Sequence, residues 1–168
     1  MKIGILGGSF DPAHKGHLAI SKEAKKRFKL EKIIWAITKK NPLKAESKTP
    51  ISKKIKDCKK IIGLNSFIKV KFYENIIKSN KTIDLINYLK KNKNIEIFFL
   101  MGADNLISFH KWHKSELISQ KCNIIVFDRH GYKKNSLKSK TFKRLNNKTL
   151  TFVEFKKVNI SSSQLRKI

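Results

Sequence analysis

The sequence predicts an α/β fold in a single domain, residues 1–168, built on a Rossmann-like, doubly wound parallel sheet. Short β-branched runs alternate with helix-like stretches along the chain, the order expected for parallel strands joined by helical crossovers. Residues 95–102, IEIFFLMG, are almost continuously apolar, as in a central strand with both faces covered. No linker or internal repeat divides the 168 residues, so one domain of ordinary size is expected.

Apolar patterns in the first half of the chain predict two strands and two helices. KIGIL and KIIWAIT are β-branched runs typical of buried strands, and a pair of glycines closes the first run. Two other segments repeat apolar side chains every three or four residues, which is typical of helices, and Gly63 is expected to end the second. The expected elements are, in order, a strand over 2–6, a helix over 15–28, a strand over 32–38 and a helix over 51–62.

Four more strands are expected in the second half. IKVKFYE alternates in polarity, whereas IEIFFLMG, NIIVFD and LTFVEF are apolar or β-branched. Thr82 is expected to cap one helix, and a later helix is expected to carry Leu106 and Ile118. The predicted strands cover 68–74, 95–102, 123–128 and 150–155, and a lysine-rich mixture of surface helix and loop covers 129–147.

The net charge of +27, from 39 Lys+Arg against 12 Asp+Glu, is a feature of many nucleic-acid-binding proteins. Only four of the basic residues are arginines, and the lysines are spread along the chain. Lys, Ile and Asn, which dominate the composition, all have A/T-rich codons. We therefore favour a diffuse, solvated basic surface over a dedicated polyanion groove, and charge alone does not decide between them.

Composition also excludes several classes of protein. No apolar run approaches the roughly 18 residues of a membrane span, and the N-terminus lacks the long apolar stretch of a signal peptide. With only Cys58 and Cys122, a disulfide-stapled fold is excluded, and both are expected to be small buried groups. A cytoplasmic protein is expected.

The segment GGSFDPAHKGH, residues 7–17, follows the first predicted strand and opens the first predicted helix. Glycine-rich backbone and a helix N-terminus together favour anion binding. His14 and His17, three residues apart, are expected to face that site, where an imidazolium would stabilise charge on a transferring phosphoryl group. A metal pair or a purely structural role is the alternative; the sequence suggests no third ligand. The spacing is neither that of a P-loop nor G-x-G-x-x-G.

This motif resembles the signature of the nucleotidyltransferase superfamily with an H-x-G-H motif, the adenylyl- and cytidylyltransferases. Further pieces make the whole chain similar to the bacterial nicotinate-nucleotide adenylyltransferases, and the G-A-D-x-L-x-x-F-x-x-W pattern points to this family in particular. The pieces are NPLK (41–44), KTID (81–84), MGADNLISFHKW (101–112), IIVFDRHGY (124–132) and NISSSQLR (159–166).

The resemblance implies that the phosphate of nicotinate mononucleotide attacks the α-phosphorus of Mg-ATP, giving deamido-NAD and pyrophosphate without a covalent intermediate. Mg²⁺ is then expected to enter with ATP, held mainly by phosphate oxygens, with no dedicated metal ligands in the chain. The expected partners are these two small substrates, with no specific nucleic acid and no membrane. The sequence does not determine the oligomeric state or the preference for the acid over the amide mononucleotide.

The resemblance also implies roles for residues on the ATP side. His14 and His17 are the predicted catalytic pair, with His17 nearest the α-phosphate. Hydroxyl residues near the C-terminus would hold the β- and γ-phosphates and Arg166 would pair with pyrophosphate, although the serines could instead form an ordinary helix cap. The predicted ATP-binding residues are Gly7, Gly8, Ser9, Phe10, His14, His17, Ser161, Ser162, Ser163 and Arg166.

A second group of residues is predicted on the mononucleotide side: Lys44, Thr82, Gly102, Asp104, Trp112 and Arg129. Asp104 would accept a hydrogen bond from a ribose hydroxyl, or it would cap a helix. Trp112 would stack on the nicotinate ring, or it would pack in the core. Each of the other three side chains has a structural alternative. Lys44 could be an ordinary surface lysine, Thr82 a helix cap and Arg129 a surface charge. Trp35 is expected in the core, and His110, His113 and His130 are assigned no chemistry.

The chain departs from the family pattern at three places. FDRHG, residues 127–131, replaces an Arg-Arg-Pro-Gly-like run, and Ser163 stands where Thr is common. Only two residues follow Arg166, so we expect either a shortened chain or a C-terminal helix that is only begun. Two alternatives stay open at this stage. One is a phosphopantetheine adenylyltransferase-like enzyme with another acceptor, and the other is an RNA- or DNA-binding protein on a relic fold.

Overall fold

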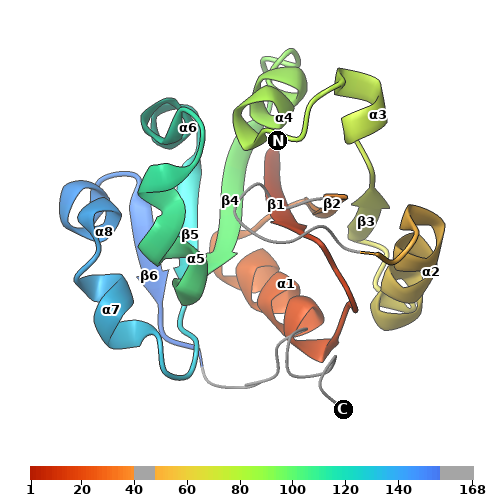
Figure 1. Ribbon diagram of the computed structural model, residues 1–168, viewed down its shortest axis with the longest axis horizontal. Helices are drawn as coiled ribbons and strands as arrows, with labels where there is room; N and C mark the ends of the chain where they lie inside the picture. The colour runs from red at the N-terminus through yellow and green to blue at the C-terminus, as the bar shows by residue number, and fades with distance from the viewer. Residues whose placement is uncertain (40–47, 156–168) are drawn as a thin grey trace.

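Six parallel strands form one sheet in the order β3-β2-β1-β4-β5-β6, which in Figure 1 runs from right to left. The structure is a computed structural model, and it describes residues 1–39 and 48–155. This order is that of a doubly wound Rossmann-like sheet and confirms the predicted fold class. The strands are β1 (Lys2–Gly8), β2 (Lys32–Ile37), β3 (Ile68–Lys71), β4 (Glu96–Gly102), β5 (Asn123–Phe127) and β6 (Leu150–Val153).

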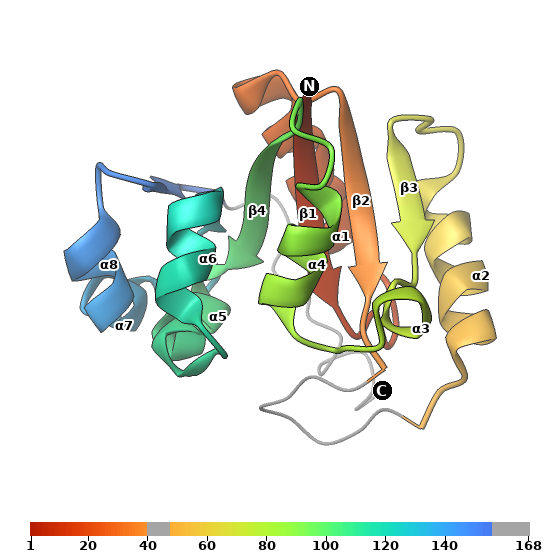
Figure 2. The same cartoon turned by 90° about the horizontal axis from the view of Figure 1, so that it is seen from above.

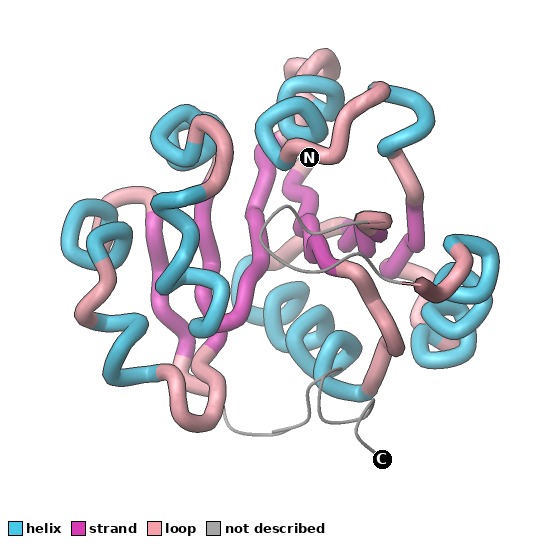
Figure 3. The backbone as a smooth tube through the Cα atoms, viewed as in Figure 1, coloured by secondary structure: helices cyan, strands magenta, loops and turns pink. Residues whose placement is uncertain are grey.

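Helices cover both faces of the sheet, as Figures 2 and 3 show. The helices α1 (Lys15–Phe28) and α2 (Ile51–Ile62) pack on one face, and α4 (Thr82–Leu89), α5 (Ala103–Ser108), α6 (Ser115–Lys121) and α8 (Lys140–Leu145) pack on the other. The short elements are α3 (Glu74–Ile77), η1 (Phe109–Lys111) and α7 (Lys133–Leu137). No helix in residues 1–39 and 48–155 is long and apolar enough to cross a membrane.

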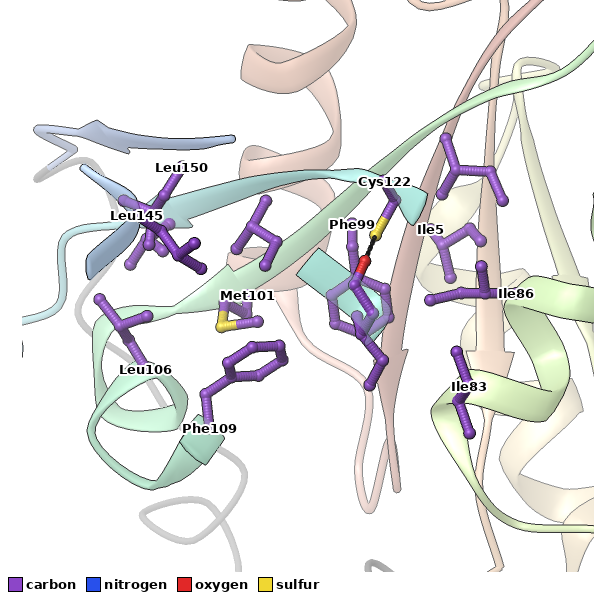
Figure 4. Packing of buried hydrophobic residues seen from close by; sticks show 14 of the residues in the cluster. Ile5, Ile83, Ile86, Phe99, Met101, Leu106, Phe109, Cys122, Leu145 and Leu150 are labelled. Atoms are coloured by element: carbon purple, nitrogen blue, oxygen red, sulfur yellow. Dashed lines mark hydrogen bonds between the residues drawn. The ribbon is translucent and has the colours of Figure 1, made fainter. Parts of the chain in front are cut away.

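Alternate side chains of each central strand enter two separate hydrophobic clusters. In β4, Phe99 and Met101 join the cluster under α4, α5 and α6, whereas Phe98 and Leu100 join the cluster under α1 and α2. Figure 4 shows the first cluster, with Ile83 and Ile86 of α4 facing the sheet. Burial on both faces explains why the β4 sequence is continuously apolar.

Several local predictions are confirmed, and some need correction. The helices α1 and α2 have the predicted bounds, and Trp35, Cys58 and Cys122 are buried. The strand predicted over 68–74 ends at Lys71, because the chain turns into α3 there. The helix predicted around Leu106 and Ile118 is three pieces, and Lys114 (φ 53°) separates the last of them from η1.

The prediction that Thr82 caps its helix is wrong. Thr82 is the first residue of α4, and Lys81 occupies the cap position without a side-chain bond to the helix. Ser79 organises this helix start instead: its Oγ accepts from the Lys81 N–H at 3.0 Å and donates to Asp84 Oδ2 at 2.6 Å. Thr82 is thereby left to line the cavity described below.

The strand order places a topological switch point between β1 and β4. The chain proceeds from β1 to β2 on one side of the sheet, and β4 pairs with β1 on the other side. In such sheets the crevice outside the carboxyl ends of these strands is where ligands bind. The predicted site residues of segments 7–17 and 102–112 lie at or just after the carboxyl ends of β1 and β4, so they converge on this crevice.

Candidate active site

A cavity of about 630 Å³ opens at the carboxyl ends of β1, β2 and β4. Its wall brings together residues that are far apart in the sequence, which is the convergence that the predicted site requires. Of the predicted residues within the described ranges, those lining the cavity are Gly7, Gly8, Ser9, Phe10, His14, His17, Thr82, Asp104, Trp112 and Arg129. Gly102 lies immediately before α5, where an added Cβ would lie 2.6 Å from Asp104 Oδ1.

His14 and His17 form a reciprocal cap at the start of α1. His14 is the N-cap, and its Nδ1 accepts from the Gly16 N–H at 3.0 Å. In return, His17 Nδ1 accepts from the His14 N–H at 3.1 Å, and the two ring centroids lie 4.0 Å apart. A Ser/Thr and a Glu/Gln usually fill these two positions. Because both Nδ1 atoms accept, each neutral ring carries its proton on Nε2.

Burial disfavours an imidazolium at this site in the structure, and the expected imidazolium beside a transferring phosphoryl group stays a prediction. Burial, together with the charge of Arg129, lowers the pKa of His14 to about 4. Burial, reinforced by His14 and Arg129, lowers the pKa of His17 to about 3. At neutral pH both rings are therefore neutral Nε2–H donors, and Arg129 supplies the positive charge.

Phe10 is among the residues that line the cavity, but it is almost fully buried and packs against His17. Its side chain is 2% exposed, and its ring packs on Trp35 (5.2 Å between centroids) and on His17 (4.6 Å). The backbone at Phe10 has φ 47°, a conformation that few non-glycine residues adopt. The ring thus supports His17, and the predicted contact of Phe10 with ATP stays a prediction.

Asp104 and Arg129 form an ion pair across the cavity wall. Arg129 Nη1 donates to Asp104 Oδ2 at 2.6 Å, and Asp104 Oδ1 is buried with no hydrogen-bond partner among the described residues. Gly102 accommodates this carboxylate, since a Cβ there would lie 2.6 Å from Oδ1. Arg129 is thus tied to Asp104, and its charge also acts on both histidines.

Trp112 combines the two roles considered for it. Its ring packs at 5.1 Å on Phe109 and edge-on at 5.9 Å against Phe99, which anchors it to the core. It is only partly buried and also lines the cavity. One part of the indole is therefore held by the core while the remainder is available to a ligand.

Sequence reasoning missed the residues that secure the end of β2. Glu74 accepts from the Thr38 hydroxyl at 2.8 Å and from the Lys39 N–H at 3.0 Å. Lys54, which is 1% exposed, donates from Nζ to the Thr38 carbonyl at 3.3 Å. Glu74 lies in the segment 68–74, which was predicted to be a strand, whereas the structure places it at the start of α3. The signal that could have found Thr38 is its position directly after a parallel strand.

Lys44, Ser161, Ser162, Ser163 and Arg166, and with them the expected C-terminal helix, lie outside the described residues. Within residues 1–39 and 48–155, no group of three or more His, Cys, Asp or Glu side chains could hold a metal ion. His113, which was assigned no chemistry, lines the cavity beside Trp112.

Comparison with known proteins identifies relatives over nearly the whole chain. Residues 5–168 match the family described as cytidylyltransferase-like. A protein of Pelagibacter ubique (strain HTCC1062) named probable nicotinate-nucleotide adenylyltransferase is 68% identical over 167 residues, which are 99% of this chain and 93% of that protein. A protein of the same name from Bradyrhizobium sp. (strain ORS 278) is 36% identical over 130 residues, 77% of this chain and 68% of its own length.

Solved structures share the fold at lower sequence identity. The Plasmodium falciparum nicotinic acid mononucleotide adenylyltransferase complexed with NaAD superimposes with a TM-score of 0.80 at 23% identity, covering 99% of this chain and 82% of that one. The fold, the paired histidines at the switch point and the sequence relatives agree. The chain belongs to the cytidylyltransferase-like family and, within it, to the nicotinate-nucleotide adenylyltransferases.

Proposed function

We propose that this chain transfers the adenylyl group of ATP to nicotinate mononucleotide and releases deamido-NAD and pyrophosphate. The name of the 68% identical relative supports this acceptor over phosphopantetheine. The observation that carries the proposal is the His14–His17 pair, which lines the same cavity as the Asp104–Arg129 ion pair and Trp112. That cavity therefore offers both donors for phosphate and an aromatic surface.

Catalysis in this proposal rests on alignment and on charge stabilisation. The mononucleotide phosphate attacks the α-phosphorus in line, and pyrophosphate leaves, so negative charge spreads over the phosphate oxygens. The Nε2–H groups of His14 and His17 and the guanidinium of Arg129 donate to those oxygens. Backbone N–H groups already hold Nδ1 of both rings, so the orientation of the rings is set before the reaction.

The cavity also has residues that suit the mononucleotide. The partly exposed face of Trp112 can stack on the nicotinate ring, and Thr82 lines the same cavity. The unpartnered Oδ1 of Asp104 is buried, and a buried acceptor of this kind is stabilised when a ligand hydroxyl donates to it. Lys44 remains the proposed contact for the mononucleotide phosphate, and Ser161, Ser162, Ser163 and Arg166 the proposed contacts for the β- and γ-phosphates.

Mg²⁺ is proposed to enter with ATP. Two carboxylates at the cavity, Asp104 and Glu74, already accept hydrogen bonds from Arg129 and from Thr38 and Lys39. Because these two carboxylates are already engaged, the site fits a metal ion held mainly by phosphate oxygens and waters better than one enclosed by protein ligands. When bound, the ion would neutralise phosphate charge.

The test is to incubate the protein with Mg-ATP and measure pyrophosphate release with nicotinate mononucleotide, nicotinamide mononucleotide or phosphopantetheine as acceptor. We expect turnover with nicotinate mononucleotide, and its absence would refute the proposal. His17→Ala is expected to abolish turnover without unfolding the protein. Retained turnover in this variant would remove the histidine pair from the mechanism. Salt-sensitive binding of RNA without turnover in the unaltered protein would instead favour the nucleic-acid-binding alternative.

A further inference from the structure

A buried hydrogen-bond relay lies behind the histidine pair. The Trp35 indole N–H donates to Ser21 Oγ at 2.8 Å, and the Ser21 hydroxyl donates to the His17 carbonyl oxygen at 2.8 Å. Ser21 and Trp35 are both 0% exposed. The relay joins β2 to the first turn of α1, the turn that carries His17.

Trp35 and His17 are also connected through packed aromatic rings, without Ser21. Phe10 packs on Trp35 with centroids 5.2 Å apart and an interplanar angle of 19°, and the Trp35 and His17 centroids lie 5.8 Å apart. Phe10 and His14 contact His17 at 4.6 and 4.0 Å. Trp35 is therefore linked to His17 in two ways, by aromatic ring contacts and by the hydrogen bonds through Ser21.

We propose that Ser21 and Trp35 are positioning residues that hold His17 in its reactive geometry, an inference that rests on the proposed adenylyl transfer. A helical serine commonly bonds to the carbonyl four residues earlier, and this bond alone needs no tryptophan. Here the same hydroxyl also accepts the indole N–H, so the position of α1 relative to β2 is set at the turn bearing the imidazole. A misplacement of about 1 Å can cost about a hundredfold in rate.

Ser21→Ala tests this role, with Ser119→Ala as the matched control. Ser119 is also a buried helical serine, 5% exposed, and its hydroxyl donates to the Glu116 carbonyl at 2.6 Å on α6, away from the cavity. We expect Ser21→Ala to lower kcat by about tenfold with both KM values unchanged, a loss smaller than that of an ångström-scale misplacement. Ser119→Ala is expected to leave kcat unchanged.

The ¹⁵N chemical shifts of the His17 ring provide a readout that does not depend on activity. The unaltered protein is expected to show a protonated Nε2 and an unprotonated Nδ1. Ser21→Ala is expected to change these shifts, because the ring loses its fixed place against the His14 N–H, whereas Ser119→Ala is expected to leave them unchanged. If Ser21→Ala does not fold, Trp35→Phe tests the same link, since it keeps a ring and removes the indole donor.

The outcomes separate this inference from the proposed function. No turnover by the unaltered protein would refute the proposed function, while the ¹⁵N comparison would still decide whether Ser21 positions His17. Turnover by the unaltered protein, with kcat and His17 shifts of Ser21→Ala equal to those of Ser119→Ala, would overturn the inference alone. In the Trp35→Phe variant, unaltered kcat and His17 shifts would also overturn it.

Discussion

The low pKa of His17 predicts that acid destabilises this protein through the active site. Burial lowers that pKa to about 3 from the usual imidazole value of 6.5, so between these values the unfolded chain binds a proton that the folded protein does not. Stability is then fully present above pH 6.5 and is lost as the pH falls. One such proton corresponds to about 1.4 kcal/mol of unfolding free energy per pH unit.

The matched variant is His17→Asn, whose amide oxygen can still accept the His14 N–H. Urea unfolding at pH values from about 7 to 4.5, followed by tryptophan fluorescence, gives the free energy of unfolding for both proteins. Between about pH 5.5 and 4.5 the unaltered protein should lose about 1.4 kcal/mol more than His17→Asn. Parallel curves would refute the reasoning, because they would mean that folded His17 carries a proton and is not a neutral donor.

Three further predictions concern the cavity wall. His14→Ala should lower kcat by about 10²–10³-fold, the loss typical of removing one donor to transition-state charge, with circular dichroism unchanged. Gly102→Ala should lower kcat/KM by about tenfold. The new Cβ would lie 2.6 Å from Asp104 Oδ1 and displace that carboxylate from Arg129. Unchanged kinetics would contradict this role of Asp104. Trp112→Leu should raise KM for nicotinate mononucleotide about tenfold, because the stacking surface is lost, and leave KM for ATP unaltered. An equal rise in both KM values would argue against stacking on nicotinate.

The prediction of the fold succeeded because its signals are local. A parallel strand buried on both faces is continuously apolar, and IEIFFLMG shows this within a single segment. The helical spacing over α2 is equally local, and its predicted bounds match the structure. Residues 68–74 were harder: their alternation continues past Lys71, and the turn into α3 ends the strand there.

By itself, the sequence determined the order of the elements and the place of the histidine pair, because periodicity and motif spacing depend on neighbouring residues. Only the tertiary structure decided the protonation of that pair and the partners of Asp104 and Ser21. Arg129 is 25 residues from Asp104, and Trp35 is 14 from Ser21, so each contact exists only once the sheet has assembled. The pKa of a buried imidazole depends on the solvent that the fold excludes and on charges brought from distant segments, and neither is encoded in local spacing.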